Sequence, residues 1–272
     1  MGTTPAIISL LTDFGDRDEY VGVMKGAILS RVPHGVIVDI CHHIASHDIR
    51  QAAAMILAAY RHFPEGTLHV MVVDPGVGSK RDIVFARARA CGFLCPDNGL
   101  LSGLRLEGIL QDVWRVTNRA LFAEAVSATF HGRDIIAPVA GFLASGGRPE
   151  LLGPPMAIRD LVCLDALAAR LATDGSLQGI VVNVDRFGNV VTNIGRELLT
   201  SFLEGDLKQS LTINLAGRHP IPLVSTYSDI PAGKLLALIG SRDTLEFAVN
   251  QGSAVSLLSV APGAPVRVIC LR

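Results

Sequence analysis

The chain has 272 residues, of which 49% are hydrophobic and only 18% are charged, and its 24 Lys and Arg nearly balance 25 Asp and Glu. This composition excludes a disordered chain, and the scattered basic residues disfavour nucleic acid and anionic membranes as partners. No apolar run approaches the ~20 residues that a membrane-spanning helix needs. The length allows one large domain or two moderate ones.

Short apolar runs alternate with helical patterns in the N-terminal half. Strands are predicted at residues 7–11, 36–40 and 68–73, and helices from Tyr20 to a stop at Pro33, from residue 48 and over residues 132–143. Asp48 is expected to cap its helix while Gln51 reaches back. The run at 68–73 is apolar on both faces, as in a central parallel strand. This alternation predicts an α/β domain with a parallel sheet.

The pattern of predicted elements changes after Gly153-Pro154-Pro155, which interrupts the chain. Strand-like segments follow at residues 179–184, 210–215, 221–224, 235–239 and 266–270, with little room for helices apart from a segment near Leu245. The sequence therefore predicts an N-terminal α/β domain over residues 1–155, a linker over 156–176 and a smaller, mostly β domain over 177–272.

The cysteines indicate a reducing compartment. They are odd in number and irregularly spaced, at Cys41, Cys91, Cys95, Cys163 and Cys270. This pattern favours free thiols in a cytoplasmic protein over a disulfide framework, and no basic segment typical of a secretory signal precedes the first strand. Cys91 and Cys95 lack partners for a zinc site and are interpreted as buried apolar residues.

Polar residues follow the predicted N-terminal strands, where parallel sheets bind their ligands. Asp13 follows the first strand, and Asp74 follows the run at 68–73. A turn-forming aspartate is an equally good interpretation of either residue alone. The glycines after Asp74 are a weak match to a phosphate loop, because their spacing lacks the third glycine and the Gly-Lys-Ser/Thr order.

Histidines offer two further candidates in this half. His131 lies at the start of a predicted helix, a position that favours an anionic or polar ligand, although a helix-entry role explains a lone histidine at least as well. His42, His43 and His47 are close in sequence, but no carboxylate or cysteine completes a recognisable motif. No metal site is therefore expected.

The β half carries a denser group of polar residues. Asp185, Phe187 and Asn189 suit a heterocycle, with the amide on an edge and the ring on a face, and they equally suit a hairpin turn. Ser241 and Arg242 follow the strand at 235–239 and are placed to hold a carboxylate. These residues alone name no reaction.

Taken together, the motifs resemble a known family over nearly the whole chain and in the right order. They are Thr12-Asp13-Phe14-Gly15, the segments 20–26, 73–78, 96–101 and 130–134, Phe187-Gly188-Asn189 with Thr192-Asn193, and Asn250-Gln251-Gly252. They resemble the S-adenosyl-L-methionine (SAM) hydroxide adenosyltransferases, which hydrolyse SAM to adenosine and L-methionine and are related to fluorinase and chlorinase.

The resemblance implies a homotrimer with an N-terminal α/β domain and a barrel-like C-terminal β domain. SAM would lie between the N-terminal domain of one subunit and the C-terminal domain of its neighbour, as the substrate of an enzyme that needs no cofactor. The family's preference for the R sulfonium epimer is expected here too. A SAM-dependent halogenase and a SAM- or adenosine-binding sensor without turnover remain as alternatives.

The resemblance also implies a set of site residues. The catalytic residues would be Asp74, Arg81 and His131, which differ in the halogenating relatives, so water is favoured over halide as the nucleophile. Asp13 would hold the ribose hydroxyls and Asn189 the adenine edge. The other substrate-binding residues would be Tyr20, Asp185, Phe187, Tyr227, Ser241, Arg242, Glu246, Val249 and Gln251. His47 departs from the family pattern, where a larger aromatic residue is expected.

Within that set, Asp185, Ser241, Arg242 and Glu246 would hold the amine and carboxylate of the methionine part. Phe187 and Tyr227 would pack near the ligand. Val249 and Gln251 would line the adenine end through their backbone.

Overall fold

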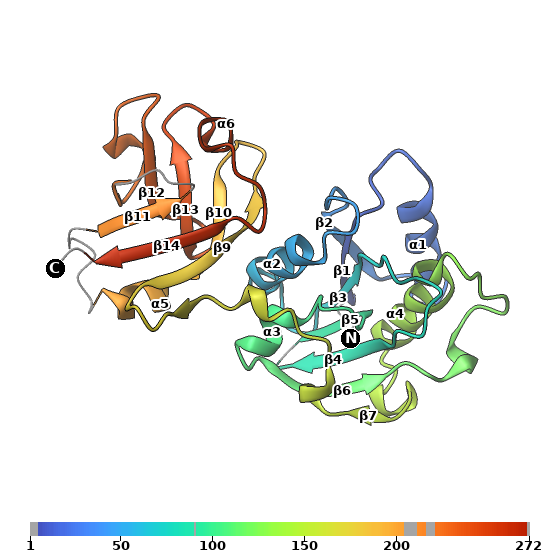
Figure 1. The fold of residues 1–272 in the computed structure, drawn as a ribbon. Helices are drawn as coiled ribbons and strands as arrows, with labels where there is room; N and C mark the ends of the chain where they lie inside the picture. Colours follow the sequence, from blue (N-terminus) through green and yellow to red (C-terminus); the bar gives the residue numbers. More distant parts are fainter. Residues whose placement is uncertain (1–4, 90, 204–210, 216–220, 271–272) are drawn as a thin grey trace. The chain divides into compact units, whose positions relative to one another are not determined.

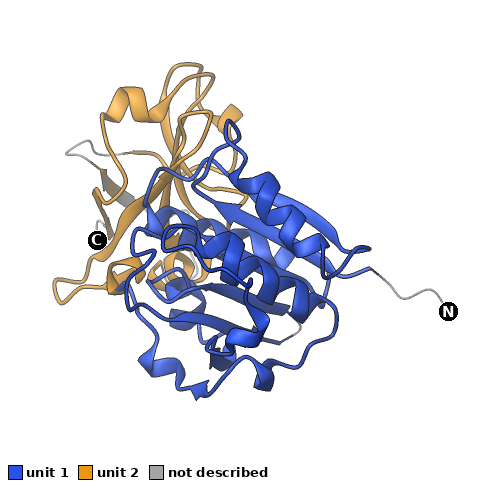
Figure 2. Ribbon diagram, turned by 90° about the vertical axis from the view of Figure 1, so that its right-hand side faces the viewer, with its two compact units in different colours: residues 1–164 blue, residues 165–272 orange. Residues whose placement is uncertain are grey.

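The structure is a computed structural model that describes residues 5–89, 91–203, 211–215 and 221–270. The chain forms two compact units, residues 1–164 and 165–272, each with its own hydrophobic core (Figure 2). The point of division lies within the linker predicted from the sequence. Each unit is described separately below.

The first unit is built on a seven-stranded mixed sheet (Figure 1). Four neighbouring strands run parallel, in the order β2 (Val36–Cys41), β1 (Ile7–Thr12), β3 (Leu68–Val72) and β5 (Cys91–Pro96). Three antiparallel strands extend the sheet beyond β5: β4 (Ile83–Ala88), β6 (Leu110–Arg115) and β7 (Pro155–Met156). The three strands predicted in this half are confirmed, and β3 is buried along its whole length between β1 and β5.

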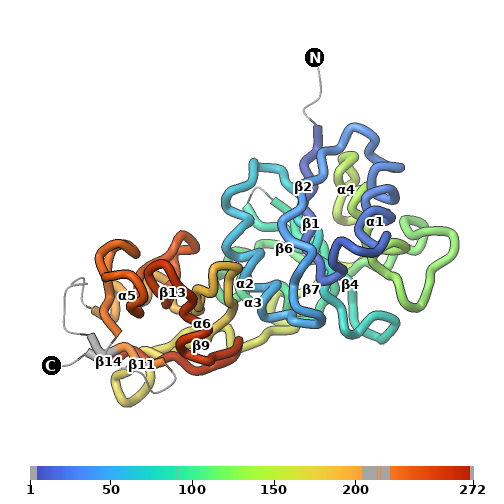
Figure 3. The backbone as a smooth tube through the Cα atoms, turned by 90° about the horizontal axis from the view of Figure 1, so that it is seen from above, coloured from blue at the N-terminus to red at the C-terminus, as the bar shows by residue number. Residues whose placement is uncertain are grey.

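Helices cover both faces of this sheet. On one face α1 (Tyr20–Leu29) and α4 (Ala137–Ala144) lie side by side (Figure 3) and pack Met24, Ile28 and Val139 on β1, β3 and β5. The other face is covered by α2 (Ile49–Ala59) and α3 (Ser102–Leu106), which bury Ile56 and Leu104. Successive strand residues alternate between the two cores, as a pleated strand requires. This double coverage explains why β1 and β3 are mostly apolar on both faces.

The helix predictions for this half are confirmed, with differences in detail. The Asp48 carboxylate accepts the N–H of Gln51 and so caps α2, while the Gln51 side chain accepts the N–H of Ala45. The helix predicted over 132–143 begins as a π-helical turn, Gly132–Ile136, and continues as α4. A wider turn at this point is a common feature of functional sites.

The second unit contains a seven-stranded antiparallel sheet. The strands pair in the order β11 (Leu211–Leu215), β14 (Pro265–Cys270), β9 (Leu177–Val184), β10 (Val190–Gly195), β13 (Thr244–Val249) and β12 (Leu235–Ile239), and β8 (Arg170–Leu171) pairs with β9. The mostly β prediction is therefore confirmed. The described pairings form a path with two ends, so closure into a barrel stays a prediction.

Two details of the β half were predicted wrongly, and a third cannot be compared. The segment near Leu245 is strand β13, because Leu245 and Phe247 alternate with Glu246 and fill the core, and the helices are instead α5 (Arg196–Phe202) and α6 (Ala254–Leu258). Residues 221–224 make only a single bridge, from Leu223 to Ala237, since Pro222 has no N–H to donate. Ser210, at the start of the predicted strand 210–215, lies outside the described residues.

Two composition-based expectations can be compared with the described residues. None of their helices is both long enough and apolar enough to cross a membrane. Four cysteines are free, at positions 41, 91, 95 and 163, and burial raises the pKa of the Cys91 and Cys95 thiols. The side chain of Cys270 lies outside the described residues, as do residues 1–4 of the predicted leader-free N-terminus.

Candidate active site

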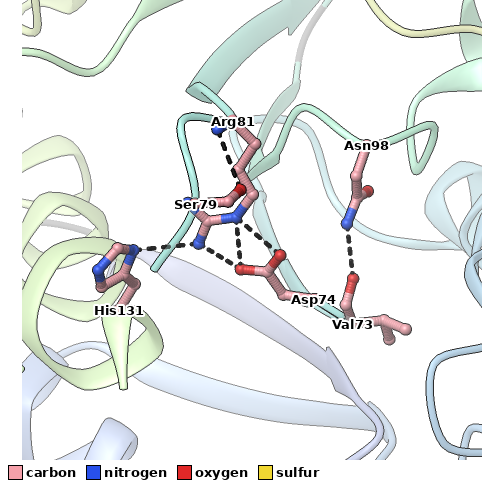
Figure 4. Close-up of polar contacts among 6 residues, drawn as sticks. All are labelled: Val73, Asp74, Ser79, Arg81, Asn98 and His131. Atoms are coloured by element: carbon pink, nitrogen blue, oxygen red, sulfur yellow. Dashed lines mark hydrogen bonds and ion pairs between the residues drawn. The ribbon is translucent and has the colours of Figure 1, made fainter. Parts of the chain in front are cut away.

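Asp74, Arg81 and His131 lie together beyond the carboxyl end of β3 (Figure 4). Arg81 Nε donates to both carboxylate oxygens of Asp74 at 2.7 Å, and Arg81 Nη2 also contacts Oδ2. The side chains of this pair are only 9% and 5% exposed. Nη2 of the same guanidinium lies 3.1 Å from His131 Nδ1. The three residues predicted as catalytic therefore form one continuous polar cluster.

The contact with Arg81 sets the state of His131. A guanidinium can only donate, so the Nδ1 atom of His131 must accept, and a neutral ring then carries its proton on Nε2. Burial lowers the pKa of His131, and the positive charge of Arg81 lowers it further. At neutral pH the cluster therefore offers a buried carboxylate, a guanidinium and a neutral imidazole with a free N–H.

Two loops must meet for this cluster to form. The loop after β3 turns at Gly78, which has a φ of +79° and whose ideal Cβ would lie 2.6 Å from the carbonyl oxygen of Ala128. Ala128 belongs to the segment that leads to His131. That segment is fixed by Asp134, whose Oδ2 accepts the Ser127 N–H at 2.8 Å and whose backbone oxygen accepts the N–H of Ala123. Asp134 is 3% exposed, so this anchor is part of the core.

We expect Gly78→Ala to lower kcat about 100-fold, because the new methyl group pushes the Asp74 loop away from the His131 segment. The matched control is Gly66→Ala. Gly66 has a similar φ of +82°, but open space surrounds its Cβ position, so the control carries the backbone strain without the collision. Steady-state kinetics and melting curves of both variants check this. Equal losses of activity in the two variants would show that the contact with Ala128 does not matter.

Asp13 lies at the same edge of the sheet as Asp74. Thr12, the last residue of β1, pairs with Val72 of β3, so both aspartates follow neighbouring strand ends. The Oδ2 atom of Asp13 accepts the N–H of His47 at 2.9 Å. His47 has a φ of +69°, a left-handed conformation uncommon for histidine. His47 thus contacts Asp13 through its backbone.

An aromatic cluster joins the Asp13 loop to the His131 loop. The rings of Phe14, Tyr20 and Phe130 contact one another with centroids 5.2–5.8 Å apart, two of the three pairs edge to face. Phe130 immediately precedes His131, and Phe14 immediately follows Asp13. Tyr20 keeps 43% of its surface exposed, and its contact with the substrate stays a prediction. The first unit therefore gathers Asp13, Tyr20 and the catalytic candidates along one edge.

In the second unit the Asp185 loop is a hairpin turn between β9 and β10, as the alternative interpretation predicted. Asp185 Oδ1 accepts the N–H groups of Phe187 and Asn189, and Oδ2 accepts the Asn189 amide at 3.0 Å. These bonds orient the Asn189 side chain and leave Phe187 76% exposed. The hairpin and the predicted ligand site are therefore compatible.

Glu246 is a buried acidic residue of this unit, with 5% of its surface exposed. Burial raises its pKa, and so does the nearby charge of Asp185, while a hydrogen bond from Tyr227 and the charge of Arg242 act in the opposite direction. The Tyr227 hydroxyl donates to Oε1 at 2.8 Å. The structure thus gathers Asp185, Asn189, Tyr227, Arg242 and Glu246.

The remaining predicted residues flank this group. Ser241 is exposed in the turn between β12 and β13. Val249 ends β13, and Gln251 follows in a left-handed conformation with a φ of +54°. The backbone of this turn is closed by a bridge between Val249 and Gly252.

Sequence reasoning missed several residues that shape the site. Asp134 lies within the quoted motif 130–134, and Asn98 lies within the motif 96–101, where its amide donates to the Val73 carbonyl oxygen at 2.9 Å. Ser79 accepts the Arg81 N–H. For Asp134 and Asn98 the available signal was their presence in motifs, whereas Ser79 lies one residue beyond the motif 73–78. The contacts of all three depend on the fold. No group of three metal-binding side chains occurs in the part of the chain that the structure describes.

Comparison with known proteins places these observations in a family. Residues 8–153 match the family model of the SAM hydroxide adenosyltransferase N-terminal domain, and residues 179–267 match that of the C-terminal domain. The chain is 36% identical to the (R)-S-adenosyl-L-methionine hydrolase of Thermus thermophilus, over 96% of this chain and 99% of that protein. Identity to the Salinispora tropica protein of the same name is 38%, over 98% and 99%.

Other relatives widen the range of activities and confirm the fold. A fluorinase of Nocardia brasiliensis is 31% identical over 96% of each chain. The crystal structure of an uncharacterized conserved protein from Thermotoga maritima has a TM-score of 0.88 at 33% identity and covers 97% of this chain and 100% of its own. From both domain matches and the full-length relatives, the chain belongs to the SAM hydroxide adenosyltransferase family.

Proposed function

We propose that this protein hydrolyses the R sulfonium epimer of SAM to adenosine and L-methionine. The observation that carries the proposal is the buried cluster of Asp74, Arg81 and His131, in a chain that shares 36–38% identity with full-length proteins named (R)-S-adenosyl-L-methionine hydrolase. In the proposed reaction a water attacks the ribose 5′ carbon in line with sulfur. The carbon–oxygen bond forms as the carbon–sulfur bond breaks.

The chemistry needs no acid for the leaving group, because a sulfonium departs as a neutral thioether. The protein must position a water and accept a proton from it. Since Arg81 occupies His131 Nδ1, the Nε2–H group donates to the water oxygen and Asp74 is the proton acceptor. Arg81 stabilises the negative charge that develops on the attacking oxygen. A positioned base of this kind contributes about 10²–10⁴-fold to the rate.

Alignment supplies much of the remaining acceleration. We propose that Asp13 holds the ribose hydroxyls and Asn189 the adenine edge, with Tyr20, Phe187 and Tyr227 against the ligand. Holding both sides of the reacting carbon in a near-attack geometry contributes roughly 7–11 kcal/mol. The methionine end would be held by Asp185, Ser241, Arg242 and Glu246, and the backbone at Val249 and Gln251 would line the adenine.

Glu246→Gln tests the methionine site. We expect the Kd for L-methionine to rise about tenfold, because the neutral amide no longer attracts the substrate amine, while kcat changes little. The exposed Glu197 on α5 provides the matched control, Glu197→Gln. Calorimetric titration of both variants with methionine measures the difference. Unchanged methionine binding in Glu246→Gln would remove Glu246 from the site.

Assembly and location belong to the same proposal. We propose a homotrimer in the cytoplasm, free of metal and cofactor, in which the site combines the first unit of one subunit with the second unit of its neighbour. Sedimentation equilibrium measures the assembly. Refolding a mixture of Asp74→Asn and Glu246→Gln chains, assayed at SAM concentrations far below KM where both parent variants are impaired, tests the shared site. Mixed trimers would contain some sites with neither substitution, and their activity would exceed the mean of the two parents.

A second candidate function is halogenation, favoured by the 31% identity to a fluorinase. One experiment separates the candidates: an epimeric mixture of SAM is incubated with protein, with and without chloride or fluoride, and products are resolved by chromatography. Hydrolysis predicts equal adenosine and methionine and loss of the R epimer, whatever halide is present. A halogenated nucleoside would indicate the halogenase. Saturable binding of SAM without any product would indicate a sensor.

A further inference from the structure

A chain of polar contacts runs from the surface of the first unit to the Asp13 loop. It begins at Lys25 on α1, whose Nζ lies 2.6 Å from Asp39 Oδ2 on β2. The other carboxylate oxygen, Oδ1, lies 3.1 Å from His42 Nε2. His42 Nδ1 lies 2.9 Å from the hydroxyl of Thr12. Thr12 is the residue before Asp13.

The charges of Lys25 and Asp39 determine which atoms donate and which accept along this series of contacts. Partial burial raises the pKa of Asp39, but hydrogen bonds and charge from Lys25 and His42 outweigh it, so the pKa lies below its ordinary value and Asp39 is an anion. An anion beside Nε2 favours the proton on that nitrogen, which leaves Nδ1 as an acceptor for the Thr12 hydroxyl. The Thr12 oxygen in turn accepts the N–H of Phe14 at 3.3 Å.

His42 therefore holds the Asp13 loop on both sides of the aspartate. Its ring contacts Thr12, which is 1% exposed, and its backbone oxygen accepts the N–H of Gly15 at 2.7 Å. Between these two contacts the chain carries Asp13. A histidine backed by a carboxylate is a known means of fixing a ring's orientation and tautomer.

We propose that His42 is a positioning residue for ribose recognition, with its orientation and tautomer set by Asp39 and Lys25. The inference rests on the proposed function, in which the Asp13 carboxylate holds the ribose hydroxyls. His42 itself touches no substrate atom. By fixing Thr12, Phe14 and Gly15, it fixes where the Asp13 carboxylate points.

The test is discrimination between adenosine and 2′-deoxyadenosine. A correctly placed Asp13 carboxylate accepts a hydrogen bond from the 2′-hydroxyl, which 2′-deoxyadenosine lacks. Calorimetry gives the ratio of the two Kd values, which we expect to be about tenfold in the unaltered protein. We expect the ratio to fall to within about twofold in Asp13→Ala and in His42→Ala. His42→Asn should restore most of it, since its amide oxygen can accept from Thr12. The exposed His34 supplies the control, His34→Ala.

The outcomes separate this inference from the proposed function. An unchanged ratio in Asp13→Ala would overturn the ribose assignment, and the inference with it. A reduced ratio in Asp13→Ala and an unchanged one in His42→Ala would overturn the inference alone. If His42→Ala does not fold, Asp39→Ala gives the same test, because the Asp39 side chain is 41% exposed and no part of the core. A purely structural role would lower the melting temperature and leave the ratio as it was.

Discussion

Asp74→Asn is expected to lower kcat for SAM hydrolysis by about 10²–10⁴-fold while KM changes little, because asparagine keeps the shape of the side chain but cannot take a proton from the water. His131→Ala is expected to lower kcat in the same way through loss of the Nε2–H donor. Since the two residues act on one water, the double variant should cost about as much as the more severe single variant. Steady-state kinetics with saturating SAM checks all three.

The matched control for Asp74→Asn is Asp112→Asn. Asp112 pairs with Arg87 on the same sheet, but both side chains are more than 40% exposed, so this variant breaks an Asp–Arg pair away from the site.

The pH dependence of kcat provides a second test of the catalytic residues. Because burial and the charge of Arg81 hold the pKa of His131 below its ordinary value, the fall of kcat on the acid side should have its midpoint below the pH at which an unperturbed histidine titrates. Near-normal kcat in both Asp74→Asn and His131→Ala would contradict the catalytic assignment.

Acid is expected to destabilise the first unit by about 3 kcal/mol between pH 6.5 and pH 4. The cause is His69, which is fully buried on β3, stacks on Phe93 and shares a hydrogen bond of 2.7 Å with Ser9. Burial lowers the pKa of His69 to about 4. In this window the unfolded chain binds a proton that the folded chain does not. The free energy of unfolding therefore decreases as the pH is lowered across this window, and it levels off below about pH 4.

Trp114 allows the stability of the first unit to be measured in a protein that has two units. It is the sole tryptophan of the chain and lies buried in β6, stacked on Phe85, so its fluorescence reports unfolding of the first unit. Urea titrations at pH 7.5 and pH 4.5 give the loss of free energy. His69→Asn keeps an acceptor for Ser9 but does not titrate, and should remove most of the pH dependence. An equal loss in this variant would place the acid sensitivity elsewhere.

The sequence predicted those parts of the fold that depend on local pattern. The strands at 7–11, 36–40 and 68–73 and the helix cap at Asp48 follow from apolar runs and capping chemistry, and the structure contains them. No strand was predicted at β4 or β5, because a pair of antiparallel strands separated by a short turn reads as one apolar segment. The strand at Leu245 was taken for a helix because tertiary pairing overrides local preference.

The site residues divide in the same way, into those that the local sequence predicts and those that only the fold brings together. Asp13 and Asp74 could be nominated from their positions after strands, since neighbouring parallel strands end at one edge. Arg81 carried no signal of its own and entered through the family resemblance, as did Glu246 and Tyr227. His42 was considered for a metal site on sequence proximity to His43 and His47. Its contact with Thr12 spans 30 positions, and only the fold shows it.

The central claim is that water attacks the ribose 5′ carbon, and the most direct measurement is the position of the new oxygen. The protein is incubated with (R)-SAM in water enriched in ¹⁸O, and the products are examined by mass spectrometry. The account predicts one ¹⁸O atom in adenosine, at the 5′-hydroxyl, and none in methionine. Label in methionine, or adenosine formed without label, would contradict it.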